Sequence, residues 1–169
     1  ENSKTEKEIL DFLKERMRNI LKEKKIRNDV IEASISSHFG DDYLDLYKKN
    51  IIMNKYINKE IGKNTINSYK RALNIIDKVD QEIAGRPDVV LFRQEEERAL
   101  FEKINEIRKA FTVKEDKKNY ENMLIQLSET KPLTDNFFDN VKVNDENQDI
   151  KNNRLELLKM FCNIFNSFI

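Results

Sequence analysis

Residues 65–76 read TINSYKRALNII and place four apolar side chains at intervals of three, four and three residues, namely Ile66, Tyr69, Leu73 and Ile76. An α-helix turns once every 3.6 residues, so side chains at these intervals lie on one helix face, whereas a strand would need every second residue to be apolar. The stretch therefore predicts an amphipathic helix, which we expect over residues 65–82.

The same helical period recurs along the chain. Only three glycines and two prolines interrupt 169 residues, of which 37% are charged, and this composition is typical of helical proteins. Gly62 to Thr65 should break a helix, and Gly85 to Asp88 should form a loop. We expect an all-α fold, a compact helical bundle of about seven to eight helices in one domain, residues 1–169. The other helices are expected at residues 5–24, 28–37, 42–61, 100–111, 114–128, 132–141 and 146–169.

Charge is unevenly distributed, although 31 basic and 31 acidic residues cancel overall. Residues 48–71 carry seven cations against one anion, Glu60, and acids dominate residues 77–102 and 129–149. Such segregation raises a local potential that attracts polyanions. A merely solvated, lysine-rich helix face is the alternative that the charge pattern also allows.

Within this basic segment, cations and carboxamides share the polar face of the helix predicted over residues 65–82. Cations neutralise phosphates, and amides hydrogen-bond base edges or 2′-hydroxyl groups, so this face suits an RNA strand. Arg71 could instead pair with an acid of a neighbouring helix, such as Asp45. Tyr69 and Tyr56 could stack on bases, but their apolar spacing favours core packing. The candidate RNA-binding residues are Lys48, Lys49, Lys55, Lys59, Asn67, Lys70, Arg71 and Asn74.

Catalytic and metal-binding patterns are absent from the sequence. His38 is the only histidine, so a histidine-based metal site cannot be built within the chain. Cys162 lies between phenylalanines at core spacing and is expected to be a buried structural thiol, which suits a reducing cytosol. Asp41, which we expect to cap the next helix, and Asp42 fit a helix N-terminus. The sequence contains no run of eighteen apolar residues, so no segment is expected to span a membrane.

Five separated blocks resemble the C-terminal part of the beta subunit of bacterial two-subunit glycyl-tRNA synthetase. They are RNDVIEA at 27–33, GDDYLDL at 40–46, YKRALNI at 69–75, PLTDNFFDNVKV at 132–143 and NRLELL at 153–158. The blocks containing Phe137 and Asn153 also resemble the helical anticodon-binding domain of arginyl-tRNA synthetase. Both the missing initiator methionine and the apolar pattern that continues to Ile169 suggest a module excised from the C-terminal end of a longer chain.

This resemblance implies a DALR-type anticodon-binding domain that binds glycine tRNA and has no catalytic site of its own. The enzyme would be a cytoplasmic glycine–tRNA ligase, in which a separate alpha subunit, in an α2β2 assembly, uses ATP and Mg²⁺ to activate glycine. No cofactor, DNA or membrane is expected for this fragment. Family members usually carry arginine where Lys49 stands, and lysine keeps the charge but loses the planar fork.

Two alternatives stay open from the residues themselves. The chain could be a helical interaction domain without an enzymatic role, which docks an acidic protein through the same basic segment, residues 48–71. Arg154 begins a predicted helix behind two asparagines, and an ion pair with Asp139 or Glu156 is the simpler interpretation of its role.

Overall fold

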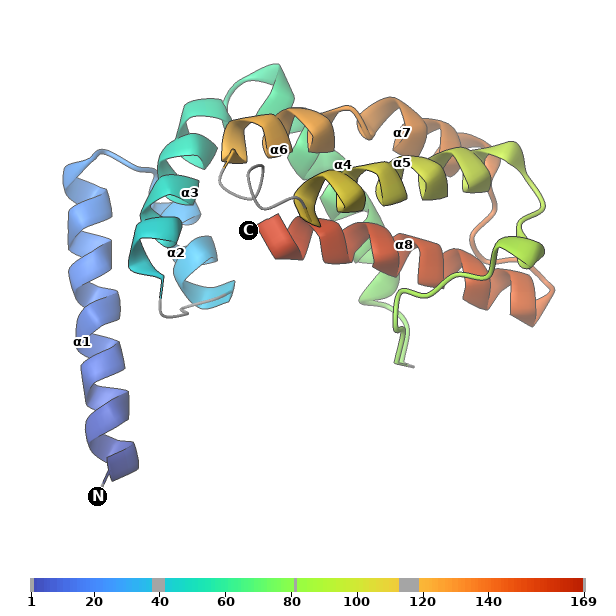
Figure 1. Ribbon diagram of the computed structural model, residues 1–169. Helices are drawn as coiled ribbons and strands as arrows, with labels where there is room; N and C mark the ends of the chain where they lie inside the picture. The colour runs from blue at the N-terminus through green and yellow to red at the C-terminus, as the bar shows by residue number, and fades with distance from the viewer. Residues whose placement is uncertain (1, 38–41, 81, 113–118, 169) are drawn as a thin grey trace. The chain divides into compact units, whose positions relative to one another are not determined.

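The computed structural model describes residues 2–37, 42–80, 82–112 and 119–168 (Figure 1). Within these ranges the chain forms eight α-helices and one 3-10 helix, with no β-strand. The predicted all-α fold is therefore confirmed. The helices divide into two compact units, Glu1–Asn58 and Lys59–Phe168, which we call unit 1 and unit 2 and describe separately. The expectation of a single domain over residues 1–169 stays a prediction.

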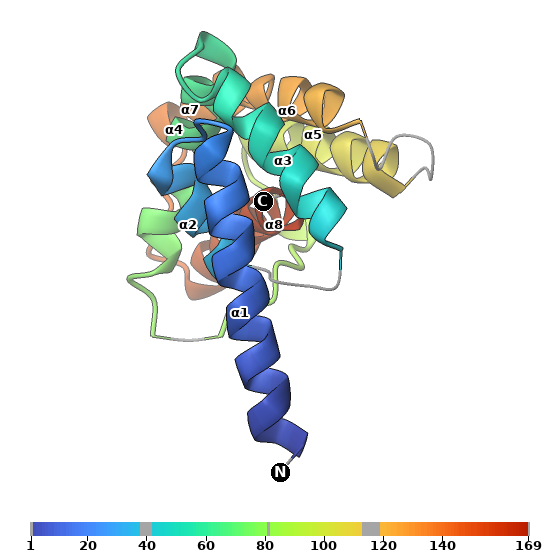
Figure 2. The same ribbon diagram turned by 90° about the vertical axis from the view of Figure 1, so that its left-hand side faces the viewer.

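Unit 1 is a three-helix unit made of α1 (Asn2–Glu23), α2 (Asn28–Ser37) and α3 (Tyr43–Tyr56). Its core contains residues from the second half of α1, from α2 and from α3, whereas the first half of α1 projects away from both partners (Figures 1 and 2). Asp42 caps α3 by accepting a hydrogen bond from the backbone N–H of Asp45 at 2.9 Å; Asp41, which we expected to be the cap, lies outside the described residues. The core residues are Met17, Leu21, Ile26, Val30, Ile31, Ile35 and Leu46.

Unit 2 is built around α8, which packs against both α4 and α5, while α6 and α7 also contact α4 and α5 (Figure 1). About half of the residues of α8 are buried, and its Cys162 is 1% exposed. Burial raises the pKa of this thiol to about 12, so Cys162 is the structural residue that its spacing predicted. The elements of unit 2 are α4 (Glu60–Ile76), the 3-10 helix η1 (Val89–Leu91), α5 (Glu95–Thr112), α6 (Tyr120–Ser128), α7 (Lys131–Asn140) and α8 (Gln148–Phe168).

The start and the buried face of α4 differ from the sequence prediction. Residues 57–59 separate α3 from α4, and Gly62 lies inside the first turn of α4 and not at a break. A glycine costs a helix only about 1 kcal/mol relative to alanine, and tertiary packing supplies most of the stability of a helix in a protein, so α4 continues through Gly62. The face turned to the core is made mainly of small side chains, whereas Ile66, Tyr69 and Leu73 are only half-buried. The buried residues of α4 are Gly62, Thr65, Ser68, Ala72 and Ile76.

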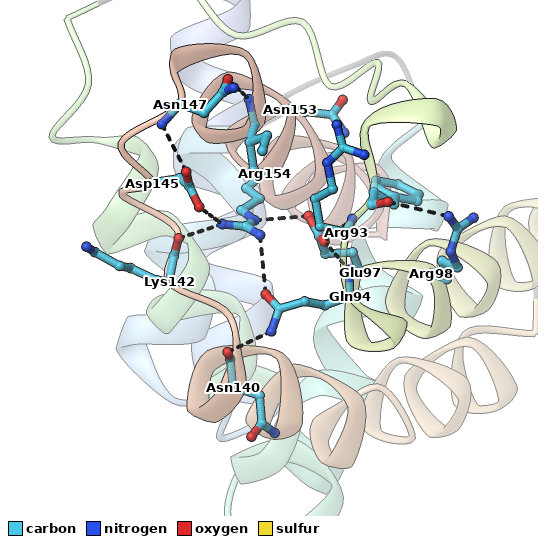
Figure 3. Close-up of polar contacts among 12 residues, drawn as sticks. Arg93, Gln94, Glu97, Arg98, Asn140, Lys142, Asp145, Asn147, Asn153 and Arg154 are labelled. Carbon is cyan, nitrogen blue, oxygen red and sulfur yellow. Dashed lines mark hydrogen bonds and ion pairs between the residues drawn. The ribbon is translucent and has the colours of Figure 1, made fainter.

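A buried arginine joins three segments of unit 2 (Figure 3). The guanidinium of Arg154, on α8, donates from Nε to Glu97 at 3.0 Å and from Nη1 to Asp145 at 2.7 Å. It also donates to the carbonyl oxygen of Lys142 at 2.9 Å and to the side-chain oxygen of Gln94 at 3.2 Å. The expected pairing of Arg154 with Asp139 or Glu156 is therefore wrong, because the side chain points into the protein toward α5 and the 142–145 loop.

Glu97 fixes the start of α5 with the same carboxylate. It is the third residue of α5, and its second oxygen accepts hydrogen bonds from the backbone N–H groups of Arg93 and Gln94, each at 2.8 Å. A glutamate at this helix position reaches back to donors that have no partner within the helix. Glu97 is fully buried, so its charge is balanced by Arg154 and by these backbone donors.

Replacing Arg154 should destabilise the fold, because the buried carboxylate of Glu97 would lose its counter-ion. Arg154→Met should lower the free energy of unfolding by about 3–5 kcal/mol, because Glu97 would stay buried without its counter-ion. Urea unfolding would measure this loss. The double variant Glu97→Gln/Arg154→Met should cost less than the sum of the two single variants. Strictly additive losses would contradict a direct coupling between the two side chains.

The Asp145 carboxylate makes part of the stability pH-dependent. A hydrogen bond from the N–H of Asn147, followed by the contact with Arg154, lowers the pKa of Asp145. Such a carboxylate stabilises the fold above its unfolded pKa, about 3.9, and this contribution is lost as the pH falls through the lowered folded value. Asp145→Asn should therefore be less stable than wild type at neutral pH, with the gap closing below about pH 4 in urea titrations. Asp149→Asn, at an exposed carboxylate, is the control, and an equal pH trend in both variants would refute the assignment.

Candidate nucleic-acid interface

The predicted RNA-binding residues fall into two groups. One group lies in unit 1, on α3, and the other lies in unit 2, on or just before α4. The α4 group forms one candidate surface, and the α3 group forms another within its own unit. The α3 group is Lys48, Lys49 and Lys55; the α4 group is Lys59, Asn67, Lys70, Arg71 and Asn74.

An exposed row of polar side chains runs along α4, and we call it the α4 row. It consists of Lys63, Asn67, Lys70 and Asn74, at steps of four, three and four residues, so the side chains follow one another on one helix face. All four are exposed, and none has a side-chain hydrogen bond or ion pair among the described residues. Lys63 was missing from the predicted set because the expected break at residues 62–65 hid its place in the helix.

Arg71 borders the α4 row but is engaged with α7. Its guanidinium nitrogens lie 3.6 Å from Asp135 and 3.4 Å from Asp139, and the group stacks over the Phe138 ring with 4.5 Å to the centroid. Pairing with a neighbouring acid was the alternative that we considered, but the acids belong to α7, whereas Asp45 pairs with Lys49 in unit 1. The Arg71 side chain is 46% exposed, so these ion pairs contribute little and a phosphate could replace them at small cost.

The cations of α3 are partly engaged as well. Lys49 lies 3.2 Å from Asp45 one turn earlier, and the ammonium of Lys55 lies 5.0 Å from the centre of the Tyr56 ring. Lys48 is exposed. This surface therefore offers less available positive charge than the count of lysines suggested.

The two tyrosines considered for base stacking serve packing. Tyr69 stacks on Phe165 with 5.4 Å between ring centroids, and its hydroxyl donates to the side-chain oxygen of Asn166 at 2.8 Å. Burial raises the pKa of the Tyr69 phenol, which therefore stays neutral at physiological pH. Tyr56 is 8% exposed. The contacts of Tyr69 with Phe165 and Asn166 and the burial of Tyr56 thus favour packing over base stacking.

Neither metal-binding clusters nor membrane spans occur in the part of the chain that the structure describes. No three histidine, cysteine or acidic side chains gather there as a metal site would require, and no described helix combines the length and apolarity needed to cross a bilayer. His38 lies outside the described residues. The fold and the α4 row thus define an all-helical module with an open polar and basic helix face.

The comparison with known families agrees with this class of module. Residues 65–168 match the sequence model of the DALR anticodon binding domain, a match that begins in α4 and ends in α8. The chain belongs to the DALR anticodon binding domain family.

Three curated relatives share the name glycine–tRNA ligase beta subunit. The chain is 36% identical over 157 residues to the glycine–tRNA ligase beta subunits of Rickettsia africae (strain ESF-5) and Sulfurihydrogenibium sp. (strain YO3AOP1), covering 93% of this chain and 23% of each relative. It is 35% identical over 162 residues to that of Rickettsia typhi (strain ATCC VR-144 / Wilmington), covering 95% of this chain and 23% of the relative. The chain thus spans less than a quarter of the length of these relatives.

Proposed function

We propose that this chain is the anticodon-recognising, tRNA-binding part of a glycine–tRNA ligase beta subunit. The observation that carries the proposal is the α4 row, an open line of two lysines and two carboxamides, within a unit whose sequence matches an anticodon-binding family. Residues 65–168 of the match coincide almost completely with unit 2. We therefore assign the principal RNA contact to unit 2, with the α3 lysines as a secondary contact.

The chemistry of the α4 row suits a single-stranded loop. Lys63 and Lys70 neutralise backbone phosphates, which supplies affinity without sequence preference. Asn67 and Asn74 each offer one acceptor and two donors, so they can match the edge of an unpaired base. Phosphate contacts and base contacts would thus alternate along one helix face, as they do along an RNA strand.

The activity of the whole enzyme extends this proposal. The complete protein would support ATP-dependent attachment of glycine to its tRNA, with a separate alpha subunit as partner in an α2β2 assembly and with ATP and Mg²⁺ used by that subunit. This chain would hold the tRNA in the cytoplasm without a cofactor of its own. An acidic protein partner gains no support from relatives that are named as tRNA ligase subunits.

Binding strength should follow the charge of the α4 row. In the full-length protein, Lys63→Gln/Lys70→Gln should weaken binding of every tRNA. The slope of log K against log salt should flatten by about 0.7 for each phosphate of a single strand that is no longer neutralised. Fluorescence titrations over a range of salt concentrations would measure both effects. Lys7→Gln/Lys24→Gln removes the same charge from exposed positions in unit 1 and should leave the slope unchanged. If the slope of log K against log salt is the same in both double variants, the α4 row does not contact the phosphates of the tRNA.

Selectivity should depend on the carboxamides. Glycine anticodons end in two cytosines, and an asparagine side chain supplies the acceptor and the donor that a cytosine edge requires. Asn74→Ala in the whole enzyme should raise the barrier expressed in kcat/KM by about 1–3 kcal/mol with normal tRNA. With a tRNA whose anticodon cytosines are replaced, the same substitution should cost much less, because the asparagine then has no cytosine edge to bind. Arg71→Ala should behave in the same way if its fork leaves α7 for the base.

Two controls complete this experiment. Asn144→Ala removes another exposed asparagine of unit 2 and should leave kcat/KM unchanged. Glycine tRNA should also outcompete an unrelated tRNA for the wild-type protein. If the wild-type protein shows no such preference, the proposal fails. If Asn74→Ala lowers kcat/KM equally with both tRNAs, only the base-reading role fails.

A further inference from the structure

A pocket of about 320 Å³ opens in unit 2 between α5, α8 and the turn around Gly85. The turn belongs to the segment that follows α4, and α5 and α8 run side by side above it in Figure 1. A volume of this size lies at the lower end of ordinary ligand sites. The lining residues are Ala84, Gly85, Arg86, Arg108, Met160, Asn163 and Ile164.

The backbone that forms one wall of the pocket is held firmly by α8. The carboxylate of Glu156 accepts hydrogen bonds from the N–H groups of Ala84, Gly85 and Arg86, at 3.3, 2.5 and 2.8 Å. Two residues further along, Asp88 exchanges two backbone hydrogen bonds with the side-chain amide of Asn153, at 2.6 and 2.9 Å. The wall is therefore preorganised and not assembled by a ligand.

Gly85 has no room for a side chain at this point. Its φ of +77° lies in the left-handed region that favours glycine, and an added Cβ would meet the amide nitrogen of Asn163 at 2.8 Å and the backbone nitrogen of Met160 at 3.0 Å. The glycine thus lets the turn lie directly against α8. This close approach brings Arg86, the next residue, to the rim of the pocket.

The lining combines two available cations with an amide and an apolar wall. The side chains of Arg86 and Arg108 are exposed and make no ion pair or hydrogen bond with the described residues, and none of the described residues that line the pocket is an acid. Asn163 is exposed as well, whereas Met160 and Ile164 are almost fully buried and contribute apolar surface. The pocket therefore offers positive charge at its rim and a less polar surface beside it.

We propose that this pocket holds one unstacked nucleotide of the tRNA bound by unit 2. The planar forks of Arg86 and Arg108 suit the oxygens of a phosphate, which they can contact in pairs. The base would enter beside the exposed Asn163, which can hydrogen-bond its edge, above a floor formed by the buried Met160 and Ile164. This inference rests on the proposed tRNA-binding function and adds a second contact, formed by different helices from the α4 row.

The test compares pocket variants with a matched arginine elsewhere in unit 2. In the full-length protein, Arg86→Gln and Arg108→Gln should each weaken binding of a glycine tRNA transcript about tenfold, as expected when one charge-assisted hydrogen bond is removed. Arg86→Lys and Arg108→Lys keep the charge but lose the fork, so they should fall between wild type and the glutamine variants. Arg93→Gln removes an exposed arginine outside the pocket and should leave the affinity unchanged.

A second readout identifies the nucleotide. Asn163→Ala should weaken binding of the transcript severalfold. This loss of affinity should disappear for a transcript with an abasic residue at the one position whose base the pocket holds. If wild type prefers glycine tRNA but the pocket variants bind like Arg93→Gln, the pocket inference is overturned and the proposed function stands. If wild type shows no preference for glycine tRNA, the proposed function itself has failed. Abasic residues are introduced at one loop position at a time. If Asn163→Ala lowers the affinity for every one of these transcripts, the base contact is overturned.

Discussion

The ion pair between Arg154 and Glu97 is the contact on which the arrangement of unit 2 depends. It joins residues 57 positions apart in the sequence, and both side chains are almost fully buried. Two buried charges recover their desolvation cost only when the remaining donors and acceptors also find partners. Here the 142–145 loop and the start of α5 provide these partners, so the relative position of α5 and α8 is tied to a complete polar network. The pocket lies between those two helices, so its shape depends on the same arrangement of α5 and α8.

Local patterns predicted the helices well because each helix carries its own period. The positions of α1, α2 and α7 follow directly from apolar spacing and nearby turn residues. The start of α4 did not, because a glycine in a first turn has the same sequence signature as a glycine in a break. The buried face of α4 was also assigned to its large apolar residues, whereas small residues such as Ser68 and Ala72 face the core. Close helix packing favours small side chains, and single-sequence periodicity does not reveal which face a neighbour approaches.

The candidate site was predictable only where one helix carries it. Asn67, Lys70 and Asn74 lie together because their spacing requires it, and their exposure follows from the polar character of that face. The partners of Arg71 and Arg154 depend on helices far along the chain, so no local pattern could identify Asp135 or Glu97. The pocket at Arg86 and Arg108 likewise joins residues of separate elements through a turn held by Glu156.

Cys162 gives unit 2 an internal reporter of its own opening. It is the only cysteine of the chain, it is 1% exposed, and its thiol pKa of about 12 leaves almost no thiolate at neutral pH. The thiolate is the form that attacks alkylating reagents, so the folded protein is modified only when local unfolding exposes Cys162 to solvent. The labelling rate at this one atom therefore reports how often the α8 core comes apart, without any engineered probe.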